Sequence, residues 1–251
     1  MTSAVEIADF RPAARRRVHE DIAEQLRDAI LDGRFPAGSK LPPEREMAIK
    51  FKVNRTTISY AIRVLEGLNL VCVRQGDAAT VQPLVNASFD VLPAMIFHGG
   101  RVDAGVLQEV LEVTRPLVFE MAKLALERST KVQIEALSAL SGRMGDEDLE
   151  DDDRAAAGRD LLVAIADMTG NRVWRMLARR LQALLASDPL QEARRGVRKN
   201  HTRLAVFVSE SIEHHKAGRR EKALGALRRA LEVLGQGFND YVQSGPAMRR
   251  R

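Results

Sequence analysis

A short polar run at residues 54–57 has the residue types that bind nucleic acid. It reads Asn54-Arg55-Thr56-Thr57, and apolar residues at helical spacing follow it. Asn54 is a favourable N-cap, and the first turn of a helix attracts phosphate through its free N–H groups and its dipole. Arginine can bind phosphate or guanine, and threonine can contact phosphate or a thymine methyl. The run therefore predicts a helix that enters a DNA major groove, although a well-capped surface helix would have the same pattern.

Three helices and a hairpin are expected to position this run. An apolar stripe with a period of 3.6 residues predicts a first helix that ends at Gly33, a second covers 44–52, and a third covers 55–67. Two strands, 71–73 and 79–81, follow as a hairpin. This order predicts a winged helix-turn-helix, in which the third helix reads the DNA. The side chains expected to face inward include Val18, Ile22, Leu26, Ala29, Ile30, Met47, Ala48, Phe51, Ile58, Ala61, Ile62, Leu65, Leu68 and Cys72.

Beyond Pro83 the pattern is helical, so the expected fold class is mainly α: an N-terminal winged helix-turn-helix followed by an all-helical bundle. The acidic run at 146–153 predicts a solvated loop or the start of a helix. The helical segments are 89–98, 103–128, 130–145, 154–168, 171–187, 190–217 and 219–243. The expected division is an N-terminal arm (1–17), the winged domain (18–82), a linker (83–88), the bundle (89–243) and a basic tail (244–251).

Composition and motifs exclude several classes of protein. The 251 residues include one cysteine, Cys72, which cannot form an intramolecular disulfide and suits a reducing compartment. No apolar run approaches the roughly 20 residues needed to span a bilayer, so we expect a cytoplasmic protein without a membrane partner. From Lys40 to Arg74 seven Lys or Arg stand against three Glu, which favours an anionic partner. Nucleophile, P-loop and dinucleotide-binding motifs are missing, so we expect neither an enzyme nor a cofactor.

Two stretches resemble known families. The text ILDGRFPAGSKLPPEREMAIKFKVNRTTISYAIRVLEGLNLVCVRQGDAATV resembles the GntR family of bacterial transcription regulators, through its LP-x-ERE and V-x-R-T-T motifs and a glycine at the wing tip. EVLEVTRPLVFEMAKLA at 109–125 and LLVAIADMTGN at 161–171 are similar to the FadR-type (FCD) subgroup, whose second domain is a helical effector-binding bundle.

The resemblance implies roles in DNA binding. Arg45 should hold phosphate and a base, and Arg55 should read the major groove. Asn54, Thr56 and Thr57 should hold the DNA backbone, and Gln75 and Gly76 should approach the minor groove. The sequence departs from the family pattern at three positions, which are Ser59 in place of arginine, Asn69 in place of glycine, and the anionic Asp77 in the wing.

The resemblance also bears on metal binding. Many FCD domains bind a divalent metal through one Asp and three His. The matching positions hold Gly158, Leu162, and approximately Val208 and Ala230, and none of these residues ligates metal. We therefore expect no metal. The possible substitutes are His201, His214 and His215, although His214-His215 also fits a solvated helix surface.

The apolar residues at these positions predict a ligand pocket in the bundle. Arg115 is the one charge expected near it, and a salt bridge to Glu112 or Glu120 is the alternative. Leu162 and Trp174 are the expected apolar walls, although Trp174 could simply pack in the core. An apolar cavity with one cation suits a carboxylate or an acyl ligand such as acyl-CoA.

The leading hypothesis is a ligand-responsive transcription regulator, with repression as the expected sign. It would bind double-stranded DNA at a palindromic operator as a homodimer, because one winged domain reads only a few base pairs. The alternative is a helical small-molecule-binding protein whose DNA-binding head is vestigial, weakened by Ser59 and Asp77.

Overall fold

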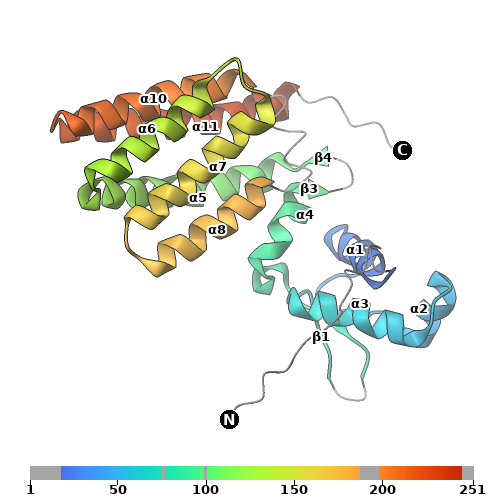
Figure 1. Ribbon diagram of the computed structural model, residues 1–251. Helices are drawn as coiled ribbons and strands as arrows, with labels where there is room; N and C mark the ends of the chain where they lie inside the picture. Colours follow the sequence, from blue (N-terminus) through green and yellow to red (C-terminus); the bar gives the residue numbers. More distant parts are fainter. Residues whose placement is uncertain (1–17, 75–76, 99–100, 187–197, 245–251) are drawn as a thin grey trace, which may run out of the picture. The chain divides into compact units, whose positions relative to one another are not determined.

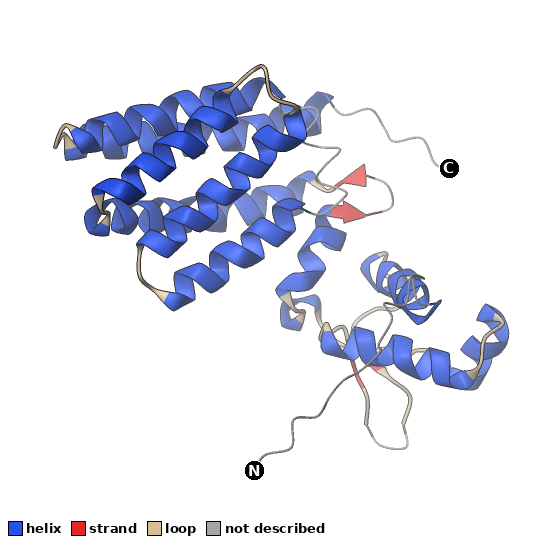
Figure 2. Cartoon of the chain, viewed as in Figure 1, coloured by secondary structure: helices blue, strands red, loops and turns tan. Residues whose placement is uncertain are grey.

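The computed structural model describes residues 18–74, 77–98, 101–186 and 198–244. The chain divides into two compact units, of which the first ends at Val91 and the second begins at Leu92. Helices dominate both units (Figure 2). This confirms the expected mainly α fold with a winged helix-turn-helix in the first unit.

The described part of the first unit contains three α-helices, a short hairpin and two single-turn 3-10 helices (Figure 1). Strands β1 and β2 are antiparallel, with Val71 opposite Val81. Residues 38–41 add a third extended segment, because Leu41 N donates to Ala79 O at 2.8 Å and Val81 N donates to Ser39 O at 2.9 Å. The elements are α1 (Val18–Leu31), α2 (Glu44–Phe51), α3 (Arg55–Gly67), β1 (Val71–Cys72), β2 (Thr80–Val81), η1 (Leu84–Asn86) and η2 (Phe89–Val91).

The core of this unit lies between α1 and α3. Both helices bury an apolar face at helical spacing, as the sequence predicts. The predicted burial is wrong for two residues. Val18 lies at the exposed beginning of α1, one turn before the first buried residue. Cys72 is exposed because side chains alternate along a strand and its neighbour Val71 faces the core.

Two residues in the left-handed conformation bracket α3. Lys52 (φ 54°) ends α2, and Asn69 (φ 55°) follows α3. Behind Asn69, Leu70 N donates to Leu65 O at 3.0 Å and satisfies a carbonyl at the end of the helix. The tight turns at both ends therefore fix the position of α3 in the unit.

The second unit is a helical bundle with one strand pair (Figure 1). Antiparallel β3 and β4, with Phe97 opposite Val102, correct the expectation of one helix over 89–98 and add a short strand pair to the helical unit. Two-residue strands are too short to give a periodic signal. The elements are α4 (Leu92–Ile96), β3 (Phe97–His98), β4 (Arg101–Val102), α5 (Ala104–Arg128), α6 (Lys131–Gly145), α7 (Asp151–Met168), α8 (Arg172–Ala186), α10 (Arg198–Lys216) and α11 (Arg220–Ser244).

Helix α7 begins within the acidic run. Its first turn contains Asp151, Asp152 and Asp153, so it starts three residues earlier than predicted. Carboxylates are favourable there because the helix dipole is positive at the N-terminus. The acidic run is thus partly a loop and partly the helix start that the sequence allowed.

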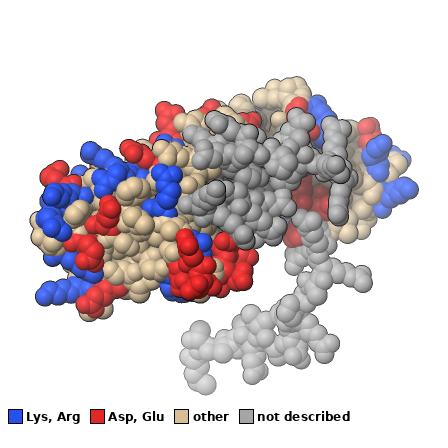
Figure 3. Space-filling view, turned by 90° about the horizontal axis from the view of Figure 1, so that it is seen from above, with Lys and Arg blue, Asp and Glu red and all other residues tan. Residues whose placement is uncertain are grey.

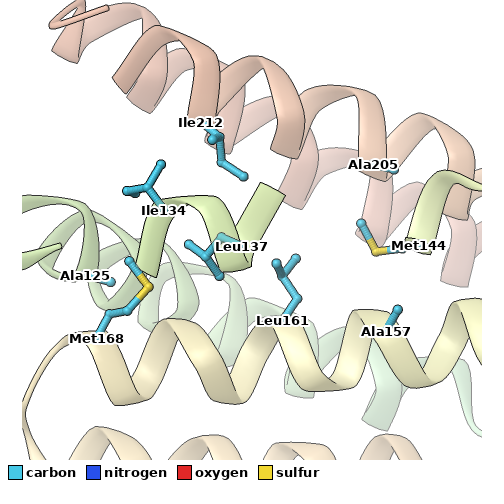
Figure 4. Packing of buried hydrophobic residues seen from close by; sticks show 9 residues of the cluster. All are labelled: Ala125, Ile134, Leu137, Met144, Ala157, Leu161, Met168, Ala205 and Ile212. Atoms are coloured by element: carbon cyan, nitrogen blue, oxygen red, sulfur yellow. The ribbon is translucent and has the colours of Figure 1, made fainter. Parts of the chain in front are cut away.

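Apolar side chains from four helices meet in the bundle core (Figure 4). Gly145 on α6 allows a close approach, because an added Cβ would lie 2.9 Å from the Cβ of Ala205 on α10. The cluster comprises Ala125, Ile134, Leu137, Met144, Ala157, Leu161, Met168, Ala205 and Ile212.

A buried arginine joins three helices of the bundle. Arg154 on α7 donates from Nε to Met144 O on α6 at 3.1 Å, and from Nη2 to Thr202 Oγ1 on α10 at 2.7 Å. The residue is only 6% exposed. These hydrogen bonds therefore replace the ones to water that the guanidinium loses when it is buried.

Candidate DNA-binding interface and effector site

Asn54 caps α3 as predicted. Its Oδ1 accepts hydrogen bonds from Thr57 N at 2.8 Å and from Thr57 Oγ1 at 2.9 Å. The Thr57 hydroxyl proton is therefore engaged within the protein. Thr56 is exposed, and its hydroxyl has no partner among the described residues. Of the two threonines, Thr56 is thus the one whose hydroxyl is available to donate to a phosphate.

Arg55 extends from the N-terminus of α3 into solvent. Its side chain is 76% exposed. Arg55 Nε donates to Glu44 Oε2 at 2.7 Å, so the first residues of α2 and α3 are joined by an ion pair. Arg45 is exposed on α2, next to Glu44. Both arginines thus belong to the exposed N-terminal turns of consecutive helices, as the DNA-binding assignment requires.

Lys40 neutralises the anion of the wing. Lys40 Nζ contacts Asp77 Oδ1 at 2.8 Å and Oδ2 at 2.9 Å. The hydrogen bond from Lys40 lowers the pKa of the Asp77 carboxyl below its ordinary value of 3.8, with a smaller contribution from the Ala78 N–H. Asp77 therefore stays ionised but paired. Gln75 and Gly76, the expected tip of the wing, lie outside the described residues.

Arg115 lies against α11. Its Nε is buried without a hydrogen-bond partner among the described residues. The predicted alternative, a salt bridge to Glu112 or Glu120, is not formed in that part of the chain, and Glu120 pairs with Lys123 at 3.1 Å. An added Cβ at Gly235 would overlap the Arg115 guanidinium. The guanidinium therefore occupies the space that a side chain at position 235 would fill.

Leu162 and Trp174 lie together but pack as core residues. Both are partly buried against a cluster formed by Met121, Ala166 and Ala178, which joins α5, α7 and α8. The sequence allowed this packing role for Trp174. The structure thus brings two of the three predicted pocket residues together, while the Arg115 guanidinium contacts α11.

The described surface of the bundle includes the following two hollows. One, of about 550 Å³, lies between α6 and α10 and is bordered by Ser141, Ser209 and His214. The other, of about 240 Å³, is bordered by Lys123, His215 and Arg220. Neither is lined by Arg115, Leu162 or Trp174. Basic and acidic side chains both occur on the face shown in Figure 3.

Comparison with known proteins decides the family. Residues 18–81 match the model of the bacterial regulatory proteins of the gntR family, and residues 109–233 match that of the FCD domain. The chain belongs to the GntR family, in its FadR-type (FCD) subgroup. The first match contains α1, α2, α3 and the hairpin, and the second contains most of the bundle.

Curated relatives share about half of their length with this chain. The HTH-type transcriptional regulator Mce2R of Mycobacterium tuberculosis is 36% identical over 121 residues, which are 48% of this chain and 50% of that protein. The uncharacterized HTH-type transcriptional regulator Rv0494 of the same species is 39% identical over 137 residues, 52% of this chain and 53% of that protein. The chain thus spans about half the length of the curated relatives it matches.

A solved structure shares the fold. It is that of Lar, described as controlling expression of the Listeria monocytogenes agr system. It covers 94% of this chain and 99% of its own, with a TM-score of 0.59 and 13% identity. This likeness shows the fold alone. Within the described residues, no helix is both long and apolar enough to cross a bilayer.

The structure accounts for the three departures from the GntR pattern. Asn69 adopts the left-handed conformation that a glycine would adopt. Asp77 is paired with Lys40. Ser59 Oγ donates to Arg55 O at 3.2 Å and so folds back onto its own helix. The Ser59 hydroxyl is therefore engaged within α3.

The residues expected at the FCD metal positions lie on three helices. Gly158 and Leu162 lie on α7, Val208 on α10 and Ala230 on α11. His201, His214 and His215 all lie on α10, and His215 Nε2 is 3.1 Å from Ser129 Oγ. Over the described ranges, His, Cys, Asp and Glu form no group of three or more able to hold a metal. That the protein binds no metal stays a prediction.

Sequence reasoning missed three residues that touch the candidate sites. Glu44 contacts Arg55, Lys40 contacts Asp77, and Gly235 accommodates Arg115. Glu44 had a usable signal, because it carries the opposite charge at the start of the helix that precedes the helix of Arg55. Lys40 had a weaker one, since 37 positions separate it from Asp77. Gly235 had none, since the contact joins helices 120 positions apart in the numbering.

Proposed function

We propose that this chain is a transcription regulator that binds a palindromic DNA operator as a homodimer. A small organic acid or acyl ligand, bound in the FCD unit, sets its operator affinity. Repression in the cytoplasm is the expected mode of action. The observation that carries the proposal is the capped N-terminus of α3, which exposes Arg55 and Thr56 while the later turns of the helix are buried.

Charge around α3 supports DNA as the partner. Lys50, Lys52, Arg63 and Arg74 are exposed in the same unit. Each can neutralise a phosphate, and the release of counterions would make binding depend steeply on salt. Such contacts give affinity for any duplex, whereas base contacts from α3 give sequence preference. A homodimer would make twice as many phosphate contacts and base contacts as a single chain.

Arg115 supports an acidic ligand. A buried N–H without an acceptor lowers stability, because its hydrogen bond to water is lost on folding. The Nε of Arg115 is such a group in the described structure. A carboxylate or a thioester carbonyl would supply the acceptor, and a carboxylate would also balance the charge. The ligand can change operator affinity only through its different affinities for the two arrangements of the protein.

The test of DNA binding begins with selection from random-sequence duplexes. The full chain should select duplexes that share a two-fold symmetric sequence and bind them more tightly than an unrelated duplex. The affinity should fall as the KCl concentration rises. Arg55→Ala should lose about 1–3 kcal/mol of binding to the selected duplex. Arg175→Ala removes the same charge from α8 and should have no effect. Failure to select any sequence would instead support the small-molecule-binding alternative with a vestigial DNA-binding head.

A separate experiment tests the ligand. Native mass spectrometry of the freshly purified chain should show a homodimer, twice 27.9 kDa, together with any retained ligand. Carboxylates and acyl-CoA thioesters should then be titrated into the operator complex. At least one should weaken binding, and Arg115→Ala should blunt that response without changing operator affinity in its absence.

A further inference from the structure

Glu44 and Arg55 occupy the first positions of consecutive helices, and their side chains meet. Arg55 Nε donates to Glu44 Oε2 at 2.7 Å. The Glu44 side chain is 29% exposed, whereas that of Arg55 is 76% exposed. The carboxylate thus lies against the protein, and the guanidinium projects from it into solvent.

This contact leaves one edge of the guanidinium open. Within the described part of the chain, neither terminal nitrogen of Arg55 has an acceptor. Nη1 and Nη2 form a planar pair that matches guanine O6 and N7. Because the guanidinium is rigid and planar, a bond at Nε restricts the direction of the opposite edge as well. Glu44 therefore limits the directions in which Arg55 can present its bidentate pair.

We infer that Glu44 is a positioning residue for Arg55 and sets the sequence preference of α3. The inference rests on the proposed function. By accepting the hydrogen bond from Nε, Glu44 orders a long side chain before DNA arrives, so less conformational entropy is lost on binding the correct base. Its negative charge also repels phosphate. Glu44 thus lowers affinity for duplexes in general and raises the preference for one sequence.

These two opposite effects distinguish positioning from other roles. If Glu44 only stabilised α2, its loss would weaken binding to all duplexes alike. If Glu44 instead kept Arg55 away from DNA, removal of Glu44 would increase affinity for the selected duplex more than for any other duplex. Positioning predicts a third result, in which general affinity rises and discrimination falls.

The test uses the full chain and the duplex that it selects. Glu44→Gln is compared with Glu46→Gln, which removes the same charge from the same helix. Glu46 is exposed and has no ion pair among the described residues. The competitors are an unrelated duplex and the selected duplex altered at the base pair where Arg55→Ala loses discrimination. The unfolding midpoint of each variant is measured alongside.

Both glutamine variants should bind the unrelated duplex more tightly and by similar factors. Only Glu44→Gln should lose discrimination at the chosen base pair, because a neutral amide oxygen accepts a weaker hydrogen bond from Arg55 than a carboxylate does, and the amide can also turn this oxygen away from Arg55. The loss should be about fivefold or more, since a bidentate contact is worth about 1–3 kcal/mol of base discrimination. In the Arg55→Ala background Glu44→Gln should change discrimination no further. Glu44→Asp keeps the charge but shortens the reach, so it should lose discrimination without gaining general affinity.

Unchanged base discrimination in Glu44→Gln overturns the inference. So does a gain in affinity for the selected duplex that is larger in Glu44→Gln than in Glu46→Gln. A uniform loss on all duplexes, with a lower unfolding midpoint, assigns Glu44 a purely structural role and also overturns it. If the unmodified chain selects no sequence, the proposed function fails, and the inference fails with it.

Discussion

Lys40 Nζ bridges both carboxylate oxygens of Asp77, at 2.8 and 2.9 Å, and so ties the segment before α2 to the hairpin. The backbone of Lys40 also pairs with Thr80 on β2. Side chain and backbone therefore hold the same two segments together. An acidic residue that would repel DNA if it were alone is here half of a neutral pair.

The first prediction concerns the ionisation of Asp77. In the folded chain the pKa of Asp77 is lowered from 3.8, mainly by Lys40. The pair therefore contributes stability above the unfolded pKa, and this contribution is lost as pH falls through the lowered folded pKa. Lys40→Ala should raise the pKa of Asp77 towards 3.8, as measured by NMR titration of the carboxyl carbon. Lys50→Ala, which removes a charge from α2, should leave it unchanged.

The second prediction concerns the wing and DNA. Asp77→Asn removes an anion and frees Lys40 for phosphate. General DNA affinity should rise, and the slope of log affinity against log salt should steepen by about one phosphate contact. Asp21→Asn on α1 removes an equal charge outside the hairpin and serves as the control. Equal slopes for the two variants would show that Lys40 gains no contact with DNA.

The third prediction concerns the turn after α3. Asn69 has φ 55°, a conformation that costs an alanine about 1–2 kcal/mol. Asn69→Ala should lower the free energy of unfolding by about 1 kcal/mol, whereas Asn69→Gly should be nearly neutral, because glycine adopts this conformation without a Cβ clash. Urea denaturation of both variants is the measurement. Equal loss in the two would mean that the Asn69 side chain, rather than its backbone, supports the turn.

The fourth prediction concerns the effector site. Gly235→Ala places a methyl group where the Arg115 guanidinium lies, so it displaces that group without deleting it. The variant should lose its response to an identified effector as Arg115→Ala does, while binding the selected duplex normally.

Gly225→Ala is the matched control for that variant. It lies on the same helix, and its added Cβ would be 3.9 Å from the nearest atom, Arg229 Nη1. It should gain about 1 kcal/mol of stability from helix propensity and keep the effector response. An intact response in Gly235→Ala would remove Arg115 from the ligand site.

Local signals in the sequence predicted local structure well. The bounds of α3 follow from Asn54 as N-cap and the apolar stripe behind it, and the left-handed turn follows from the tolerance of Asn69 for positive φ. The strand pair β3–β4 was missed because it is too short to show a period. The hairpin that contains Cys72 was predicted correctly, but Cys72 was placed on the buried face of its strand and lies on the exposed one. A two-residue strand is too short to show which of its side chains face the core.

Contacts between elements were harder to predict. The ion pair between Glu44 and Arg55 depends on how the turn at Lys52 places α2 against α3, which periodicity does not specify. The position of the Arg115 guanidinium likewise depends on which face of α5 meets α11. Sequence patterns name the residues of a candidate site, while the three-dimensional arrangement decides which of them meet.

The hydrogen bonds of Arg154 have a mechanical consequence. Its guanidinium holds the end of α6 and the beginning of α10, and Thr202 passes the link on by donating to Glu147 Oε1 at 3.2 Å. Separating α7 from either neighbour would break hydrogen bonds of a charged group that is only 6% exposed, which is costly. We therefore expect the end of α6, the first turn of α7 and the beginning of α10 to move together, and a ligand-driven hinge to lie away from Arg154.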